Sequence, residues 1–401
     1  MDFMNKKINL FFIIGSLRVG GAEKSLVSLL HSLPQDKYCI DLMLMKKEGH
    51  FLSMLPKNIN LVHPCPALEC YATSPKNISF YFKIGIKWWI KKIIRWQIAK
   101  RDKEYSPLQK LWKIWSKDIT SINKHYDIAI AYIDEAPTYY VIEKVLANKK
   151  IIWNHCDYNL LHHVPSFDEY YYMLADNIVT ISDECKKRII EFFPIINPQK
   201  IIVLNNISNG YLIHELSKEY QNDEMFNSTK GFKILSVGRL SEAKNYKLAL
   251  KAAYILKQKI SFTWFIIGEG PLRNELEKLR NKLGLNNVYF IGIRMNPYYY
   301  MKHVDCMVMS SLTEGKSIAV DEAKIMQLPI VSTNYPTIND NLTNNFNGII
   351  TEMTPESLSE GIYTILTNSS LRKKIKDNLS KDYNGNIEEI KKYIDLFTQQ
   401  Y

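Results

Sequence analysis

The sequence predicts an α/β fold made of two doubly wound, Rossmann-like domains. Short apolar runs, typical of buried strands, alternate with helical patterns over almost all of the 401 residues, as in parallel sheets covered by helices. A polar, Asn- and Ser-rich stretch at 205–230 interrupts this alternation, and a domain boundary is expected there. We therefore expect domains at 1–205 and 206–380, followed by a terminal helical segment at 381–401.

Each domain contributes its own series of predicted strands. In the first half these are Ile8–Ile14, Ile40–Met45, Ile128–Tyr132, Ile151–Trp153, Ile178–Ile181 and Ile201–Leu204, and in the second half Lys233–Val237, Thr263–Ile267, Val288–Ile291, Cys306–Met309 and Ile330–Ser332. The first run leads into Arg18 without a small-x-small cleavage site, so we expect a buried strand and not a secretion signal. Open parallel sheets bind ligands beyond the carboxyl ends of their strands, which predicts a ligand cleft between the domains.

Composition excludes some classes of protein and leaves several partners open. The chain is 46% hydrophobic and 23% charged, and its six cysteines form no CxxC pair. No apolar stretch reaches the roughly 18 residues needed to span a bilayer. Disordered proteins, disulfide frameworks and zinc ribbons are therefore not expected. The net charge of +11 favours nucleic acid, an acidic membrane surface or phosphorylated small molecules as partners.

Two segments of the second half have the pattern of an anion site. After the first strand of this half, Gly238 allows a tight turn, and Arg239 and Lys244 are spaced to close on an anion. The alternative is a solvated loop with two surface cations. After the fourth strand, a Ser/Thr/Gly loop leads into a helix that begins near Ser317, and the free N–H groups of a helix start favour an anion.

Two glutamates accompany the second of these loops. Glu314 lies in the loop, and Glu322 follows eight residues later inside the helix. One carboxylate can face a ligand at the helix mouth while the other accepts hydrogen bonds from diol hydroxyls, although ordinary surface acids are the alternative. The GxG at 268–270 lacks the third glycine of the dinucleotide fingerprint, so a nicotinamide or flavin site is not supported.

Taken together, these residues resemble the retaining glycosyltransferases of family 4. The resemblance is carried by Gly238-Arg239 with Lys244, Gly268-Glu-Gly-Pro-Leu, Asn296-Pro-Tyr ahead of Asp305, Glu314-Gly followed by Glu322, Gly20-Gly21-Ala-Glu23, and Trp153-Asn-His155. It runs in order from about residue 8 to residue 350. It implies the GT-B fold, with a nucleotide-sugar donor on the C-terminal domain, an acceptor mostly against the N-terminal domain, and metal-independent hexose transfer with retention of configuration.

The resemblance also implies a role for each matching residue. Four would act in catalysis: Arg239 and Lys244 on the donor pyrophosphate, Glu314 beside the transferred carbon, and His155 near the 6-position of the sugar. The others would bind the donor: Glu322 its ribose, Arg294 its base, Gly238, Gly315, Lys316, Ser317 and Ile318 its phosphates and sugar, and Gly20 and Gly21 its sugar phosphate. Residues 387–397 would form a helix that returns to the first domain.

Some residues depart from the family pattern near the donor sugar. Lys316-Ser317 stand where an aromatic residue and a proline are common, Asp321 precedes Glu322 where an apolar residue is usual, and Gln327 replaces a frequent glycine. Both glutamates are present, so the expected chemistry stands, while the identity of the sugar is left open.

Residues 83–103 carry eight cations and one acid together with three tryptophans and six isoleucines. At helical spacing they form an apolar side made of Ile86, Ile90, Ile93, Ile94, Trp89 and Trp96, and lysines fill most of the other side. Such helices commonly lie on anionic membranes. The equal alternative is a helix packed on the first domain with its lysines in water. Nucleic acid is not expected, because no nucleic-acid-binding motif accompanies the charge.

The expected function is transfer of a hexose from a UDP-sugar, in preference to a GDP-sugar, to a saccharide or lipid-linked saccharide. The product would be a bacterial surface polysaccharide or glycolipid, such as capsule or lipopolysaccharide. We expect a cytoplasmic enzyme, with peripheral attachment to the inner face of the membrane as an option, and neither cofactor nor metal. The spacing of His155, His162 and His163 does not match common zinc patterns. A non-catalytic nucleotide-sugar-binding or membrane-surface GT-B protein and a UDP-sugar epimerase are the alternatives.

Overall fold

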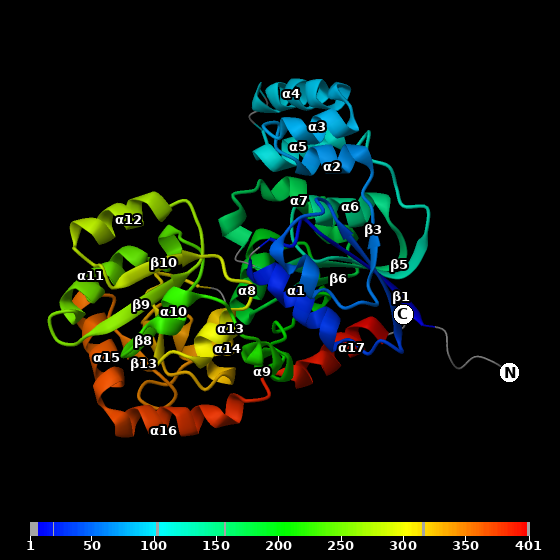
Figure 1. Cartoon of the computed structure of the whole chain (residues 1–401). Helices are drawn as coiled ribbons and strands as arrows, with labels where there is room; N and C mark the ends of the chain where they lie inside the picture. The colour runs from blue at the N-terminus through cyan, green and yellow to red at the C-terminus, as the bar shows by residue number, and fades with distance from the viewer. Residues whose placement is uncertain (1–6, 19, 102–103, 156–157, 315–316, 399–401) are drawn as a thin grey trace. The chain divides into compact units, whose positions relative to one another are not determined.

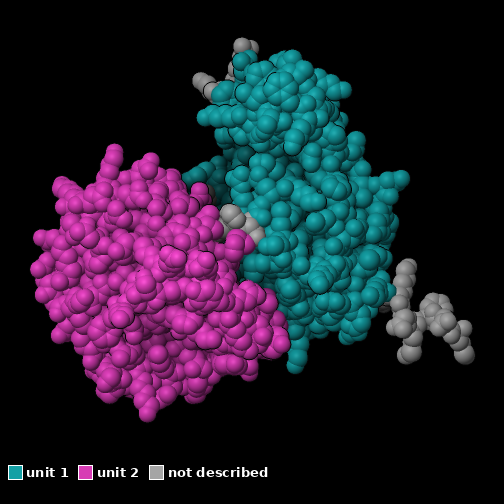
Figure 2. All heavy atoms as spheres, in the orientation of Figure 1, with its two compact units in different colours: residues 1–206, 389–401 teal, residues 207–388 magenta. Residues whose placement is uncertain are grey.

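The computed structural model describes residues 7–18, 20–101, 104–155, 158–314 and 317–398. Contacts within the chain divide it into two compact units (Figure 2). Unit 1 comprises residues 1–206 and 389–401, and unit 2 comprises residues 207–388. Each unit is a parallel sheet with helices against it, and this confirms the predicted α/β class of two Rossmann-like domains (Figure 1).

Unit 1 contains a seven-stranded parallel sheet in the order β3-β2-β1-β4-β5-β6-β7. Its strands are β1 (Ile8–Ile14), β2 (Tyr38–Leu44), β3 (Asn60–Val62), β4 (His125–Ala131), β5 (Leu146–Asn154), β6 (Asn177–Thr180) and β7 (Ile201–Val203). The order of the strands reverses between β1 and β4. In sheets of this kind, ligands bind at such a reversal, outside the carboxyl ends of the strands.

Some helices of unit 1 cover this sheet, and others form a separate group at one end of the unit. They are α1 (Gly21–Ser32), α2 (Pro66–Ala72), α3 (Ile78–Ile84), α4 (Ile86–Arg101), α5 (Pro107–Trp115), α6 (Ala136–Lys144), α7 (Pro165–Leu174), α8 (Asp183–Phe192) and α17 (Ile390–Thr398). The helices α2 to α5 form a group at one end of the unit, with α4 outermost (Figure 1). The start of α5 is fixed by a capping box between Ser106 and Gln109, which satisfies two backbone N–H groups.

The orientation of α4 corrects one expectation drawn from its sequence. Ile90 and Ile94 of the predicted apolar side are exposed, whereas Lys92 is buried. The helix packs through its tryptophans and its cations, because Lys92 and Arg95 lie over the ring of Trp115. The helix is packed on other helices of unit 1, as one of the two alternatives expected, and Lys87 is in water, but Lys92 departs from that expectation because it lies on the covered face.

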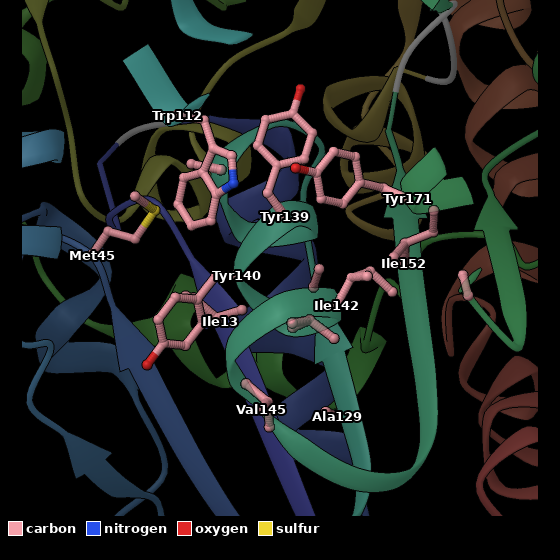
Figure 3. Close-up of a cluster of buried hydrophobic side chains, with 14 of the residues drawn as sticks. Ile13, Met45, Trp112, Ala129, Tyr139, Tyr140, Ile142, Val145, Ile152 and Tyr171 are labelled. Carbon is pink, nitrogen blue, oxygen red and sulfur yellow. The ribbon is translucent and has the colours of Figure 1, made fainter. Parts of the chain in front are cut away.

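Aromatic side chains hold the helical group of unit 1 to its sheet. Figure 3 shows Trp112 of α5, Tyr139 of α6 and Tyr171 of α7 gathered above the sheet residues Ile13 and Ile152. The ring centroids of Trp112 and Tyr139 are 5.5 Å apart, and those of Tyr139 and Tyr171 are 4.4 Å apart. Tilted aromatic pairs at these distances contribute about 0.5–1.5 kcal/mol beyond the area that they bury.

Unit 2 contains a six-stranded parallel sheet in the order β10-β9-β8-β11-β12-β13. Its strands are β8 (Phe232–Val237), β9 (Phe262–Ile267), β10 (Val288–Gly292), β11 (Cys306–Met309), β12 (Ile330–Thr333) and β13 (Ile349–Thr351). Its helices are α9 (Gly210–Lys218), α10 (Glu224–Ser228), α11 (Tyr246–Leu256), α12 (Arg273–Lys282), α13 (Pro297–Lys302), α14 (Ile318–Ile325), α15 (Pro355–Thr367) and α16 (Ser369–Leu379). Here the strand order reverses between β8 and β11.

The last helix, α17, belongs to unit 1 although it follows the whole of unit 2. Tyr393 is fully buried, its hydroxyl donates to the carbonyl of Asn205 at 2.8 Å, and its ring stacks on Trp153. Lys149 of β5 donates to the carbonyl of Leu396 at 2.8 Å. In the described part of the chain, no helix has the length and apolar character that crossing a membrane requires.

Candidate functional site

The reversal of strand order in unit 2 brings two predicted site residues together. Lys244 ends the loop that follows β8, and Glu314 lies in the loop that follows β11, the neighbouring strand. The Nζ atom of Lys244 lies 2.5 Å from Oε1 of Glu314. Residues 70 positions apart in the sequence therefore form a charge-assisted hydrogen bond at the place where a sheet of this order binds its ligands.

Hydrogen bonds from neighbouring hydroxyl groups hold both residues of this ion pair in place. Glu314 also accepts a hydrogen bond from the Ser311 hydroxyl at 2.6 Å, and its carbonyl accepts one from the Thr337 hydroxyl at 3.0 Å. The carbonyl of Lys244 accepts from the Ser310 hydroxyl at 2.8 Å. The side chains of Lys244 and Glu314 are 19% and 14% exposed, so they are largely shielded from water.

Glycines allow the backbone to come close to this pair. A Cβ atom on Gly238 would lie 3.0 Å from Cε of Lys244 and 3.2 Å from the hydroxyl of Tyr246. Gly268, at the end of β9, has φ +146°, and a Cβ there would lie 1.9 Å from the carbonyl oxygen of Gly238. The loop that carries Arg239 and Lys244 thus rests directly on the backbone of the next strand end, and a side chain at Gly268 would displace it.

The start of α14 supplies a second polar feature beside Glu314. Ser317 is the N-cap residue, it is 4% exposed, and its hydroxyl has no hydrogen-bond partner among the described residues. The first N–H groups of a helix have no partner within the helix and attract anions, and Ile318 is the first residue of this helix. Gly315 and Lys316, which were also predicted to bind the donor, lie outside the described residues.

Glu322, the second glutamate of the pattern, lies inside α14 and is 3% exposed. Its Oε1 accepts a hydrogen bond from the Tyr298 hydroxyl at 2.8 Å. A buried carboxylate needs such partners, because an unpaired charge would be strongly destabilising. Burial, followed by the charge of Glu322 and this hydrogen bond, raises the pKa of Tyr298 well above its usual value, so the phenol remains the donor.

The two predicted arginines of unit 2 have different surroundings. Arg239 is exposed, and its side chain forms no ion pair with a described residue. Arg294 donates to Asp223 at 2.9 Å and to the hydroxyl of Tyr300 at 2.9 Å. Together with residues 221–224, Arg294 and Tyr300 line an open cavity of about 520 Å³. Arg294 is therefore held by Asp223, a residue that no motif in the sequence singles out.

The predicted residues of unit 1 lie at the carboxyl ends of its strands. Gly20 is the N-cap of α1, and a Cβ on it would lie 2.1 Å from the Glu23 carboxylate; Gly21 begins the same helix. His155 follows β5, and its ring lies 4.9 Å from that of Tyr132. Burial lowers the pKa of His155 to about 4 despite a backbone hydrogen bond with Tyr132, so its imidazole is neutral at physiological pH.

A polar network that the sequence analysis did not predict lies in unit 1. The buried carboxylate of Asp168 accepts from the hydroxyls of Tyr139 and Tyr158 at 2.6 and 2.7 Å and contacts Nδ1 of His163 at 2.8 Å. The Nε2 atom of His163 lies 3.7 Å from Oε1 of Glu135. Glu135 adopts φ +71°, a costly conformation for a glutamate, and it follows β4, at the reversal of strand order. Backbone strain at this position is not visible in a sequence.

The described residues of unit 2 therefore bring Lys244, Glu314 and the start of α14 into one site, with Glu322 inside the same helix. His155, Gly20 and Gly21 belong to unit 1. No cluster of three or more His, Cys, Asp or Glu side chains that could hold a metal ion is found among the described residues.

Comparison with known proteins identifies the family of the second half of the chain. Residues 217–382 match the family model described as glycosyl transferases group 1. An uncharacterised glycosyltransferase of Methanocaldococcus jannaschii is 34% identical over 172 residues, which cover 42% of each chain. An N-acetylgalactosaminyltransferase of Campylobacter jejuni is 33% identical over 36% of this chain and 40% of its own. The chain thus spans about two fifths of these curated relatives. The predicted resemblance to glycosyltransferases is confirmed for this part, as a match to group 1.

Solved structures extend the likeness of fold to both units. HepE of Anabaena, solved in complex with UDP and glucose, superposes with a TM-score of 0.67 at 16% identity and covers 97% of this chain and 98% of its own. At that identity the likeness concerns the fold, which is the GT-B fold of glycosyltransferases. The fold implied by the resemblance is therefore confirmed.

Proposed function

We propose that this chain, whose residues 217–382 match the group 1 glycosyl transferases, is a retaining hexosyltransferase that uses a UDP-sugar. The observation that best supports this is the Lys244–Glu314 pair at the reversal of strand order in unit 2. A fixed cation, an acidic partner and the start of a helix are combined there. A nucleoside diphosphate carries the negative charge that such a site attracts, and its departure from a sugar adds more.

In the proposed reaction the bond between the anomeric carbon and the diphosphate oxygen breaks, and the diphosphate takes the bonding electrons. The acceptor hydroxyl forms a new bond to the same face of that carbon, and its proton passes to the leaving phosphate oxygen. Lys244 and Arg239 would stabilise the growing negative charge, as would the N–H groups at the start of α14. Glu314 would hold Lys244 before the donor binds and then lie beside the sugar.

Buried and glycine-lined positions would complete the donor site. Glu322, fixed by Tyr298, would accept hydrogen bonds from the ribose, and the Ser317 hydroxyl would donate to a phosphate oxygen. Gly315, Lys316 and Ile318 would offer N–H groups, and Gly238 would let the diphosphate approach the backbone. Arg294 would contact the base. In unit 1, Gly20, Gly21 and the neutral imidazole of His155 would contact the sugar. No metal or cofactor is proposed.

Two relatives support the choice of substrates. HepE was solved with UDP and glucose, which favours a UDP-sugar as donor. The name of the Campylobacter jejuni relative specifies a saccharide linked to diphospho-undecaprenol, which favours a lipid-linked saccharide as acceptor. We therefore place the enzyme in bacterial surface polysaccharide or glycolipid synthesis, in the cytoplasm and peripherally on the inner face of the membrane through residues 83–103.

The decisive experiment compares Lys244→Ala with the control Lys247→Ala. Lys247 lies three residues away on α11 and pairs with Glu242 and Glu275 on the surface. We expect Lys244→Ala to lower the rate of UDP-glucose turnover, with or without acceptor, at least a hundredfold, because one preorganised donor contributes ~3–4 kcal/mol to the transition state. Lys247→Ala should remain within about threefold of wild type, since Lys247 pairs with surface carboxylates and not with Glu314.

Calorimetry and product analysis separate this proposal from its alternatives. Wild type should bind at least one sugar among UDP-glucose, UDP-galactose, UDP-N-acetylglucosamine and GDP-mannose, and release free nucleoside diphosphate. An epimerase would instead return an isomerised UDP-sugar, and a non-catalytic protein would bind the donor without consuming it. Equal rates in the two lysine variants would contradict the proposal that Lys244 stabilises the leaving diphosphate.

A further inference from the structure

The outer face of α4 is a row of isoleucines. Ile86, Ile90, Ile94 and Ile98 recur every fourth residue, so they share one face of the helix, and they are 48%, 49%, 51% and 50% exposed. We call these four side chains the isoleucine row. At ~1.5 Å per residue it extends for about 18 Å along the helix. α4 is the outermost helix at its end of unit 1 (Figure 1).

The opposite face of α4 is fixed to the protein by cations and aromatic rings. Lys92 is 4% exposed, and its Nζ donates to the carbonyl of Tyr71 at 2.7 Å. The guanidinium of Arg95 lies 4.5 Å from the ring centroid of Trp115 and pairs with Asp118. The ring of Trp88 stacks on that of Trp115. These contacts hold the helix in one rotational setting, in which the isoleucines face solvent.

Further exposed apolar side chains lie on α3, the helix that precedes α4 and contacts it. Phe82 and Ile78 of α3 are 73% and 52% exposed. Isolated exposed apolar residues are common, but a gathering of this kind marks a surface that contacts another body. The sequence pattern alone could not decide between the two faces of α4, because its isoleucines and its tryptophans both follow helical spacing.

The charge around the isoleucine row identifies the partner. Residues 70–101 contain eight lysines and arginines and no aspartate or glutamate. Lys91 and Arg95 pair with Asp118 and Lys92 is buried, whereas Lys76, Lys83 and Lys87 are exposed. A partner must therefore be apolar at its centre and negatively charged around it. A second copy of the chain does not fit, because a symmetric contact would bring the same lysines of both copies together. An anionic lipid bilayer meets both requirements.

We infer that the isoleucine row inserts into an anionic membrane surface, with α4 lying in the plane of the head groups. Its apolar side chains would enter the outer acyl region to a depth of roughly 5–10 Å, while Lys83 and Lys87 contact lipid phosphates. This inference deepens the proposed function, on which it rests for the lipid-linked acceptor. It specifies which face of residues 83–103 meets the membrane.

The test measures vesicle binding by the full chain and needs no substrate. Vesicles of phosphatidylcholine with 30% phosphatidylglycerol should bind wild type at low salt, and pure phosphatidylcholine should bind it at least tenfold more weakly. Ile90→Asp/Ile94→Asp should reduce the partition coefficient at least tenfold. Because both isoleucines are exposed, the melting temperature of the double variant should match that of wild type. The control is Ile195→Asp, at an isoleucine that is 60% exposed outside the helical group.

A tryptophan placed in the row provides a second, local readout. In Ile94→Trp, insertion should shift the emission of the new indole to shorter wavelength and allow its quenching by brominated lipid. Trp96 itself follows the buried Lys92 by four residues and therefore faces away from the row. The inference is overturned by any of three results: wild type does not bind anionic vesicles, the double variant binds them as tightly as wild type, or Ile195→Asp reduces the partition coefficient as much as the double variant does.

Two further measurements separate this inference from its rivals. If sedimentation shows that wild type dimerises and the double variant does not, the row is a self-association surface and the inference is wrong. Binding of UDP-sugar in vesicle-free buffer tests the proposed function alone. A double variant that binds UDP-sugar normally but does not bind vesicles would support both proposals. If wild type itself binds vesicles but no UDP-sugar, the proposed function is wrong and the membrane inference is not affected.

Discussion

His163 is a cation held inside unit 1, and this has a consequence for stability. Burial lowers the pKa of His163, but its hydrogen bonds and charge interactions with Asp168 and Glu135 outweigh that effect and raise it to about 9. The ordinary value for histidine is about 6.5. The folded state therefore binds the proton more tightly than the unfolded state, and the stabilisation is fully present below about pH 6.5. It is lost as the pH rises through 9.

We predict that His163→Gln destabilises the protein most at pH 6 and much less at pH 10. The difference between these two effects should be about 3 kcal/mol. The measurement is urea unfolding of wild type and variant at each pH, and the quantity compared is the difference between their free energies of unfolding. Burial lowers the pKa of Lys92 to about 8, and this group alone would make wild type more stable as the pH rises. His125→Gln, at an exposed position, is the control. A destabilisation independent of pH would contradict a charged His163.

At the scale of elements, two glycines at neighbouring strand ends should have separable effects. Gly268→Ala would place a methyl group on the carbonyl of Gly238 at a positive φ. Strain and overpacking should lower the free energy of unfolding by about 2–5 kcal/mol. Gly238→Ala meets only side-chain atoms of Lys244 and Tyr246 at 3.0–3.4 Å. It should leave stability nearly unchanged and displace the lysine.

Thermal melting and donor affinity distinguish these two substitutions. Gly268→Ala should melt several degrees lower, and ligand should restore part of the loss. Gly238→Ala should melt like wild type but bind UDP-glucose at least tenfold more weakly. The interpretation fails if Gly238→Ala is the more destabilised protein, because then the glycine serves folding and not the approach of the ligand.

Elements with continuous apolar runs were predictable from the sequence, and short or ambiguous ones were not. The buried strands β1 and β11 coincide with Ile8–Ile14 and Cys306–Met309. The edge strands β3 and β13 have three residues each, which is too short for a period to be recognised. In the candidate site, likewise, residues within a recognisable pattern were predictable and contacts between distant segments were not. Lys244 and Glu314 were found through their motifs, whereas Tyr298 contacts Glu322 only because the chain folds α13 against α14.

At the scale of the whole molecule, α17 completes unit 1 from the far end of the sequence. Phe397 contacts the rings of Phe12 and Tyr38 edge-on, and Tyr393 stacks on Trp153. We predict that Tyr393→Ala destabilises unit 1 by about 3–5 kcal/mol, the usual cost of removing a buried aromatic side chain. Tyr254→Ala, on the 45% exposed Tyr254 of α11, should cost little.

Hydrogen exchange can assign the loss to one unit. In Tyr393→Ala, amide protection should fall in β1, β2 and β5 and remain unchanged in β8 to β13. Equal loss in both sheets would mean that the two units unfold together, and then α17 could not be said to stabilise unit 1 alone.

The late position of α17 also bears on how the protein forms during translation. The strands of unit 1 leave the ribosome first, yet the helix that covers Phe12 and Tyr38 is synthesised after all of unit 2. Unit 2 is one uninterrupted stretch of chain and can close as soon as it emerges. Domains usually fold in the order of their synthesis. Here an apolar surface of the nascent amino-terminal sheet stays uncovered until α17 has been made, so the last folding step of unit 1 follows the synthesis of unit 2.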